Sequence, residues 1–150
     1  MEKLPNADFY KQVFEKGVPF NAFMGFELLE VREGYVKLRV PYKQGFIGEF
    51  RENRLHGGVL LAAVDSAAGI ASFTTANIMT DKMATVDLRL DFINPSIAED
   101  VIVEGIVKKS GSRIIFTHAL VYHPSNPTHL IAEGRATYSV KRQEKYEDKK

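Results

Sequence analysis

The sequence has no cysteine among its 150 residues. The chain can therefore form no disulfide, use no thiolate nucleophile and hold no metal through sulfur. An apolar signal segment is also missing, because charged residues such as Glu2, Lys3 and Asp8 interrupt the N-terminal region. Together these absences favour a cytoplasmic protein.

Long apolar runs and an excess of charge are absent as well. The longest apolar run, residues 59–64, is far shorter than the ~20 residues that a membrane-spanning helix needs, so no membrane partner is expected. The 20 basic residues nearly balance the 19 acidic residues, for a formal net charge of +1. Because no overall field attracts a polyanion, a nucleic-acid partner is not expected either.

The chain does have the composition of one globular domain, with 45% hydrophobic and 26% charged residues. We expect a single domain over residues 1–150. A helical segment over residues 6–24 precedes a core over about residues 25–140, and a charged tail covers residues 141–150.

The N-terminal half alternates between helical and extended patterns. Phe9, Val13 and Phe14 are at helical spacing in "NADFYKQVFEKG", a pattern that ends at Gly17. A second short helix fits "PFNAFMG". The next segment, "FELLEVREGYVKLRVPY", predicts a hairpin that turns at "EG". The segment "KQGFIGEFRENR" has no sustained period, so it is predicted to be a loop.

The C-terminal half predicts four strands. Val86, Leu88, Leu90 and Phe92 alternate with charged residues, which is typical of a strand with one wet face, and Pro95 ends it. Further extended runs are "EDVIVEGIVKKS", "RIIFTHALVYH" and "LIAEGRATYSVKR". The whole pattern predicts an α+β fold with five to six antiparallel strands and one apolar helix.

That helix lies in "NRLHGGVLLAAVDSAAG", where alanine is abundant and β-branched residues are scarce. We expect it to begin near His56 or Gly57 and to run for about 20 residues. The alternative is a buried strand over "VLLAAV", with Asp65 as the N-cap of a later helix.

A single carboxylate, Asp65, stands in the middle of this apolar segment. On a helix it shares a face with small residues such as Ala62, Ala68 and Gly69, which let a ligand or another backbone approach. An unpaired buried carboxylate is costly. Asp65 is therefore either a functional group or a hydrogen-bonded residue that serves fold specificity.

Two glycines begin the same helix. The N–H groups of Gly57 and Gly58 lack intrahelical acceptors and can stabilise an oxyanion, although a tight turn is the plainer explanation. Gly57 and Asp65 are about 12 Å apart along the axis, too far to act on one carbon. If two copies pack these helices antiparallel, Gly57 of each chain falls opposite Asp65 of the other, and a homodimer contains two sites.

The motifs "LHGGVLLAAVDSAAG", "ATVDLRLDFINPS", "IVKKSGSRIIF" and "LIAEGRATYSV" resemble the hotdog-fold acyl-CoA thioesterases, specifically the phenylacetate-pathway thioesterase-like branch of the 4-hydroxybenzoyl-CoA thioesterase superfamily. The resemblance implies an antiparallel sheet wrapped around one long central helix, in homodimers or homotetramers. It also implies hydrolysis of an acyl-CoA to free acid and CoA without metal or other cofactor. Asp65 would be the base or nucleophile, and the Gly57 N–H of the partner subunit would be the oxyanion donor.

The resemblance also points to supporting residues. Thr85 matches a position where relatives carry a hydroxyl near the attacking water. Many relatives have an asparagine six or seven residues before the histidine, where this chain has Phe50 and Glu49; Asn53 is the nearest amide and the expected substitute. We expect His56 to brace the loop through a side-chain hydrogen bond rather than to act as a base, because it has no identifiable orienting partner.

The CoA phosphates would need cations at the mouth of the site. Lys108, Lys109 and Arg113 are the candidates, and the alternative is that they are solvated strand-end charges. Five phenylalanines either line an acyl pocket or belong to the core: Phe23, Phe26, Phe46, Phe50 and Phe73. The alternative function is acyl-CoA binding without hydrolysis. A hydratase on this fold would need a catalytic histidine paired with the carboxylate, and the predicted helix contains no histidine.

Overall fold

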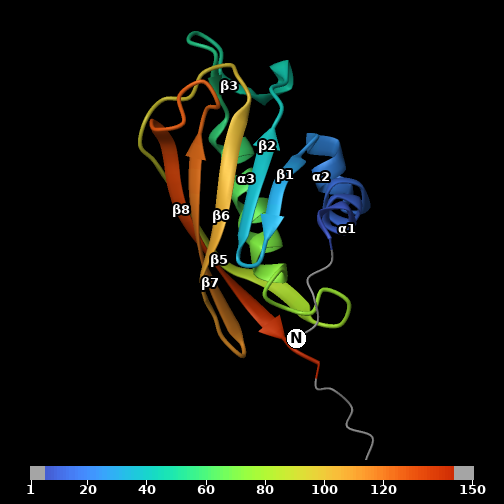
Figure 1. Cartoon of the computed structure of the whole chain (residues 1–150). Coiled ribbons are helices and arrows are strands. Elements are labelled where there is room, and N and C mark those ends of the chain that lie inside the picture. Colours follow the sequence, from blue (N-terminus) through green and yellow to red (C-terminus); the bar gives the residue numbers. More distant parts are fainter. Residues whose placement is uncertain (1–5, 144–150) are drawn as a thin grey trace, which may run out of the picture.

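The computed structural model describes residues 6–143, in which a long helix packs against a curved antiparallel sheet (Figure 1). The N-terminal segment forms helix α1 (Ala7–Lys11), a π-helical stretch η1 (Gln12–Gly17) and helix α2 (Pro19–Met24). The Asn6 side chain caps α1 by accepting a 2.9 Å hydrogen bond from the Phe9 N–H. The predicted helical end at Gly17 and the short helix in "PFNAFMG" are confirmed.

Six strands form the main sheet. In chain order they are β1 (Glu27–Arg32), β2 (Tyr35–Val40), β5 (Lys82–Phe92), β6 (Val101–Ser110), β7 (Ile114–Tyr122) and β8 (Leu130–Lys141). The spatial order is β1-β2-β6-β7-β8-β5, and all neighbours are antiparallel. The α+β class, the hairpin and the three C-terminal strands are confirmed. Among the described residues, β1 and β5 are the edge strands of this sheet.

The segment predicted to be a loop contains short regular elements, so that prediction is wrong in part. It folds into a 3-10 turn η2 (Gln44–Phe46) and a small antiparallel pair, β3 (Ile47–Glu49) with β4 (Arg54–Leu55). Strands of two or three residues are too short to give a readable period. Asn53 lies in the connecting turn with φ of 53°, a left-handed conformation that asparagine tolerates.

Helix α3 (Gly57–Phe73) confirms the helix interpretation and excludes the strand alternative. Its buried face consists largely of alanine, and the side chains of Ala63, Ala67 and Ala71 are fully buried. An added Cβ at Gly105 of β6 would lie 2.6 Å from the Ala67 carbonyl oxygen. Small side chains on the helix and glycine on the strand therefore allow α3 to lie directly on the sheet.

The simple alternation expected for β5 is wrong at its centre. A β-bulge interrupts the β5–β8 register between Thr85 and Asp87, and Val86 is 61% exposed. The bulge changes the phase of the strand, so that Thr85 and Leu88 both point toward the helix side although three positions separate them. Thr85 can therefore point toward the centre of α3 while the apolar residues that follow it in β5 still face the core.

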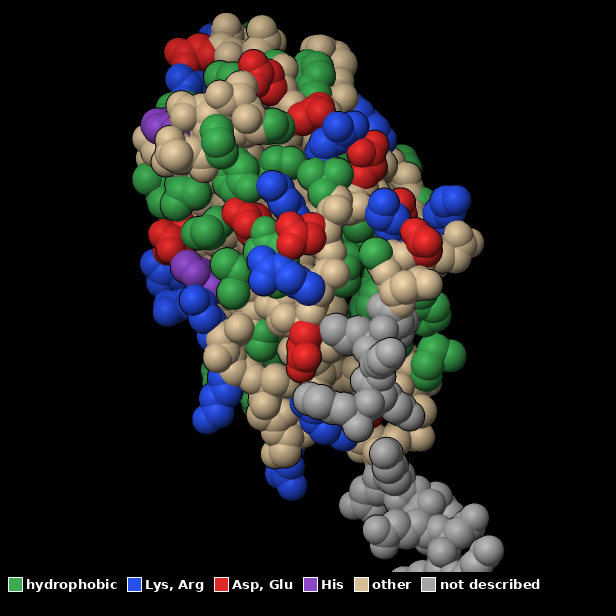
Figure 2. Space-filling model, viewed as in Figure 1, with side chains coloured by type: hydrophobic (Ala, Val, Ile, Leu, Met, Phe, Trp, Pro, Cys, Tyr) green, Lys and Arg blue, Asp and Glu red, His purple; other side chains and the backbone are tan. Residues whose placement is uncertain are grey.

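The outer surface carries charges of both signs. Figure 2 shows basic and acidic side chains interspersed over the visible face of the described residues. This mixture agrees with the near-zero net charge of the chain. Within residues 6–143, no helix is long and apolar enough to cross a membrane.

Candidate active site

The Asp65 carboxylate lies on α3 and accepts hydrogen bonds from two strands. The Thr85 hydroxyl on β5 donates to Asp65 Oδ1 at 2.9 Å, and the Tyr138 hydroxyl on β8 lies 3.1 Å from the same oxygen. The Tyr138 hydroxyl also donates to the Asp65 backbone carbonyl at 2.8 Å. The β5–β8 register places Thr85 directly opposite Tyr138, so one cross-strand pair orients the carboxylate.

Tyr138 is a functional candidate that sequence reasoning missed. Its side chain is only 3% exposed, and burial raises the pKa of its phenol well above the usual value. The charge of Asp65 and the hydrogen bond to it raise this pKa further. The hydroxyl therefore stays protonated and remains a donor. The only signal in the sequence is an inward position on an alternating strand, which any core tyrosine would share.

A second missed residue, Asn21, ties the N-terminal segment to the same part of α3. Its side chain is 5% exposed; it donates to the Phe14 carbonyl and accepts from the Ser66 hydroxyl, each at 2.9 Å. Both polar ends of the buried amide are thus satisfied. This arrangement holds α2 and η1 beside the residue that follows Asp65, and the sequence offers no pattern that predicts it.

These elements enclose a pocket of about 300 Å³ next to Asp65. One side is polar and contains Asp65, Thr85, Tyr138 and the Asn21–Ser66 pair. The other side is apolar and is lined by Phe14, Val18, Phe20, Ile70, Phe73 and Met83. A charged group at the edge of an apolar pocket suits a substrate with one polar reacting centre and an apolar body.

The N-terminus of α3 forms a separate corner. His56 is the N-cap residue, and its Nδ1 accepts a 2.9 Å hydrogen bond from the Gly58 N–H. The Gly57 N–H makes no hydrogen bond within residues 6–143. The Gly57 amide is therefore the donor left for a ligand, at the positive end of the helix dipole.

Within one chain the structure does not bring Gly57 and Asp65 together. They are separated by eight residues of continuous helix, about 12 Å at 1.5 Å per residue. Gly57 is not among the residues that line the Asp65 pocket. A reaction that uses both groups needs a second copy of the chain.

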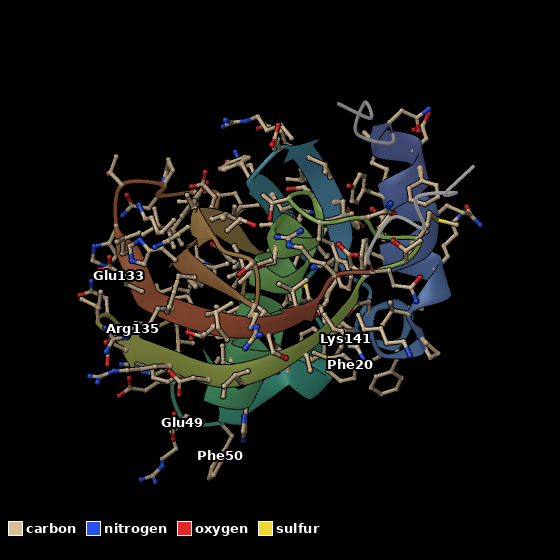
Figure 3. All side chains as sticks on the ribbon, turned by 90° about the horizontal axis from the view of Figure 1, so that it is seen from below. Phe20, Glu49, Phe50, Glu133, Arg135 and Lys141 are labelled. Atoms are coloured by element: carbon tan, nitrogen blue, oxygen red, sulfur yellow. The ribbon has the colours of Figure 1, made fainter. Side chains whose placement is uncertain are left out.

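The other predicted site residues are dispersed. Asn53 lies in the exposed β3–β4 turn together with Phe50, which is 78% exposed and points away from the ribbons in Figure 3. The three candidate phosphate-binding cations do not line the Asp65 pocket; they are exposed at the β6–β7 turn: Lys108, Lys109 and Arg113.

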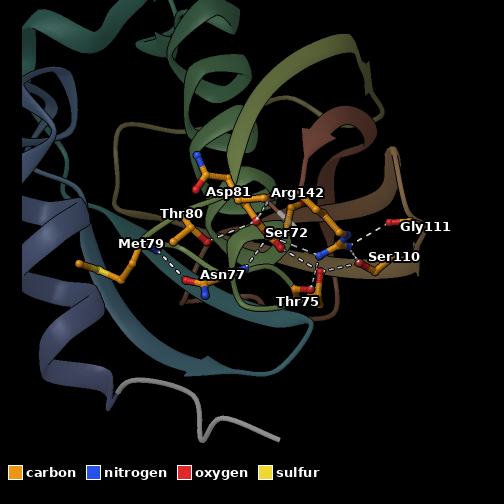
Figure 4. A network of polar contacts seen from close by, with 10 residues as sticks. Ser72, Thr75, Asn77, Met79, Thr80, Asp81, Ser110, Gly111 and Arg142 are labelled. Carbon is orange, nitrogen blue, oxygen red and sulfur yellow. Dashed lines mark hydrogen bonds and ion pairs between the residues drawn. The ribbon is translucent and has the colours of Figure 1, made fainter. Parts of the chain in front are cut away.

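The β6–β7 turn is held at the C-terminal end of α3 by a polar network. Thr75 donates to the Ser110 hydroxyl at 2.9 Å, and the Arg142 guanidinium donates to Ser110 at 3.1 Å and to the Gly111 carbonyl at 2.9 Å (Figure 4). The candidate cations therefore lie at the opposite end of the helix from Gly57.

The five phenylalanines divide three ways. Phe73 lines the pocket, whereas Phe26 and Phe46 belong to the buried core. Phe23 and Phe50 are exposed, each by 78%. Phe14 and Phe20 also line the pocket, although the sequence pattern did not single them out for it.

The structure has one long helix packed against a curved antiparallel sheet, and a carboxylate in the middle of that helix lies beside an apolar pocket. These features define the class of protein, which is a hotdog-fold protein. The sequence profile of the thioesterase superfamily matches residues 52–128, just over half of the chain. The chain belongs to the thioesterase superfamily and is a thioester hydrolase.

Curated relatives and solved structures agree with this assignment. The chain is 25% identical over 141 residues to the medium/long-chain acyl-CoA thioesterase YigI of Escherichia coli, covering 86% of this chain and 90% of that protein. A Silicibacter pomeroyi thioesterase family protein superposes with a TM-score of 0.78 at 25% identity, covering 89% of this chain and 99% of that one. A Haemophilus influenzae thioesterase shares the fold, with a TM-score of 0.82 at 17% identity over 97% of each chain.

Proposed function

We propose that this protein is an acyl-CoA thioesterase that hydrolyses an acyl-CoA to the free acid and CoA. The observation that carries the proposal is the Asp65 carboxylate, which Thr85 and Tyr138 orient at the edge of an apolar pocket. The similarity to a medium/long-chain acyl-CoA thioesterase supports the same substrate class. His56 serves as a cap and not as a base, since its Nδ1 accepts from the Gly58 N–H.

The reaction follows from the two polar groups. In the general-base route, Asp65 takes a proton from water as the water oxygen attacks the thioester carbonyl carbon. In the nucleophilic route, a carboxylate oxygen of Asp65 attacks that carbon and water then hydrolyses the resulting anhydride. In both routes the Gly57 N–H of the partner subunit donates to the carbonyl oxygen as it gains negative charge. The C–S bond breaks as the oxyanion collapses, and CoA leaves as a thiolate.

The homodimer that this chemistry needs is supported by the open edge of the sheet. Strand β5 has no neighbour on its outer side within the described residues, and it spans 11 residues. Val86, Phe92 and Ile93 on or next to it are exposed by 52% to 61%. A long edge strand with exposed apolar residues is a pairing surface. Two β5 strands paired about a two-fold axis run antiparallel, so the Gly57 end of one α3 approaches the Asp65 region of the other.

In this dimer the CoA phosphates would lie toward the exposed turn that joins β6 and β7. Lys108, Lys109 and Arg113 stay the proposed cations for them, because they are exposed and none of them forms an ion pair within residues 6–143. Asn53 stays the proposed substitute for the asparagine of the relatives, and its left-handed turn conformation is a second, structural reason for an asparagine at this position.

The test is thiol release from acetyl-, hexanoyl-, decanoyl-, palmitoyl- and phenylacetyl-CoA, with Asp65→Asn beside wild type. Loss of the base or nucleophile is expected to lower the rate by roughly 10²- to 10⁴-fold. Asp8→Asn, a matched carboxylate change on exposed α1, is the control and should keep full activity. If Asp65→Asn retains the wild-type rate, the catalytic assignment is wrong. If wild type binds acyl-CoA but releases no thiol, the protein is a binding protein.

A further inference from the structure

We propose that Phe50 of each subunit closes the acyl pocket of its partner and makes the enzyme selective for long apolar acyl groups. The inference rests on the proposed function and on its homodimer. It assigns to the β3–β4 turn a role in substrate selection.

Phe50 is exposed without an evident structural reason. Its side chain is 78% exposed on a turn whose other members are charged or polar, Glu49, Arg51, Glu52 and Asn53. A large apolar side chain exposed at a turn gains free energy when a partner surface or a ligand covers it. The Arg51 guanidinium lies 5.8 Å from the Phe50 ring centre, which leaves most of the ring uncovered.

The turn is attached firmly to the oxyanion corner. The His56 N–H donates to the Phe46 carbonyl at 2.8 Å, so the two ends of the segment are bonded together. An added Cβ at Gly48 would lie 2.6 Å from His56 Cα, which shows how closely β3 packs on the residue that begins α3. Wherever Gly57 is placed in the dimer, Phe50 is carried with it.

The open edge of the sheet and Phe50 are on the same side of the molecule. Figure 3 shows Phe50 and Glu49 projecting beyond the yellow-green ribbon of β5, and Phe20 lies on that side as well. Antiparallel pairing of two β5 strands reverses the direction of α3 between subunits. The segment that precedes α3 in one subunit then meets the Asp65-to-Phe73 half of α3 in the other, and that half lines the pocket.

The pocket is apolar on the side that Phe50 would approach. Phe20 is 50% exposed at its rim, and Ile70 and Phe73 lie deeper along α3. An acyl chain that leaves the thioester would run between these residues and the Phe50 ring of the partner subunit. Short acyl groups end before this contact, whereas long apolar acyl groups gain from it.

The experiment measures kcat and KM for acetyl-, hexanoyl- and decanoyl-CoA with Phe50→Ala, Phe50→Leu and a matched control. The control is Phe23→Ala, because Phe23 is equally exposed at 78% but lies on α2. Phe50→Ala is expected to raise the KM for decanoyl-CoA roughly 10-fold at nearly unchanged kcat, with little change for acetyl-CoA. Phe50→Leu should restore most of the decanoyl-CoA affinity, and Phe23→Ala should match wild type.

A second readout separates this inference from the proposed hydrolysis. Decanoyl-CoA binding is measured by calorimetry in the Asp65→Asn background, with and without Phe50→Ala. If wild type hydrolyses nothing but Phe50→Ala still weakens decanoyl-CoA binding roughly 10-fold, the hydrolase proposal fails and the role of Phe50 stands. If Phe50→Ala changes all acyl lengths equally, changes none of them, or behaves as Phe23→Ala does, the inference is overturned.

Discussion

The hydrogen bonds from Tyr138 to Asp65 predict what Tyr138→Phe will do. The substitution removes one oxygen atom and leaves the ring in place between β8 and α3. The lost hydroxyl lies 3.1 Å from Asp65 Oδ1 and 2.8 Å from the Asp65 carbonyl oxygen. Thr85 still donates to the carboxylate at 2.9 Å. Asp65 therefore keeps the hydrogen bond from Thr85 but loses one of its two side-chain donors.

The size of the effect can be bounded. A hydrogen bond to a charged group contributes about 1.5–3 kcal/mol, and each 1.36 kcal/mol on the barrier is about tenfold in rate. The single phenol proton of Tyr138 is shared between two oxygens, and the shorter contact is to the backbone carbonyl, so we expect the lower part of this range. The kcat should fall about 10- to 30-fold with KM nearly unchanged, because the hydroxyl is already engaged by two oxygens of Asp65.

The assay compares steady-state thiol release by wild type, Tyr138→Phe and Tyr122→Phe. Tyr122 is a suitable control because it is also buried, at 7% exposed, but its hydroxyl faces Glu104 instead of Asp65. A double-mutant cycle with Thr85→Val then measures whether the two donors act on the carboxylate as a pair. If Tyr138→Phe keeps the wild-type kcat while Asp65→Asn is inactive, the orienting role of Tyr138 is refuted.

Two further predictions concern the homodimer and the stability of the protein at alkaline pH. Gly57→Pro removes the proposed oxyanion N–H at the first helical position, where the φ of proline fits a helix. An added Cβ at Gly57 would lie 3.0 Å from the exposed Phe92 ring, so this ring has to shift in the variant. Mixing this inactive variant with Asp65→Asn should restore about a quarter of the wild-type rate after subunit exchange, and no recovery would mean that each site uses a single chain. Burial raises the pKa of Tyr122 to about 12 and the pKa of Tyr138 still higher, above the ordinary 10.0. The contribution of these two phenols to the free energy of unfolding should therefore be constant below pH 10 and be lost as the pH rises through the folded values, since the unfolded chain ionises first. Urea unfolding and tyrosinate absorbance against pH measure this, and early ionisation of both phenols would contradict it.

Much of the architecture could be predicted because it depends on local patterns. The alanine-rich composition around Asp65 predicts helix α3, and the period-2 runs after residue 100 predict β6, β7 and β8. The small β3–β4 pair could not be predicted, because two or three residues carry no period. The bulge in β5 could not be predicted for a different reason. The bulge residue Val86 is of a type that also occurs at paired positions, so the residue type alone does not reveal the bulge.

The candidate site, like the fold, has features that the local sequence predicts and features that it does not. A lone carboxylate in an apolar helix and two glycines at its start can be recognised from the chain order, because both features lie in one short segment. Their separation of about 12 Å also follows from helix geometry alone. The sequence by itself therefore determined the helix and the charge on it, and it predicts that a site using both Gly57 and Asp65 needs a second chain.

Only the tertiary structure decided what surrounds that charge. Tyr138 is 73 residues from Asp65 in sequence, and Asn21 is 45 residues from Ser66. Such contacts depend on strand register and on how the N-terminal helices dock, both of which result from the packing of the whole core rather than from any local pattern. The bulge that turns Thr85 toward Asp65 belongs to the same category, because it satisfies the pairing of β5 with β8 and the apolar core at the same time.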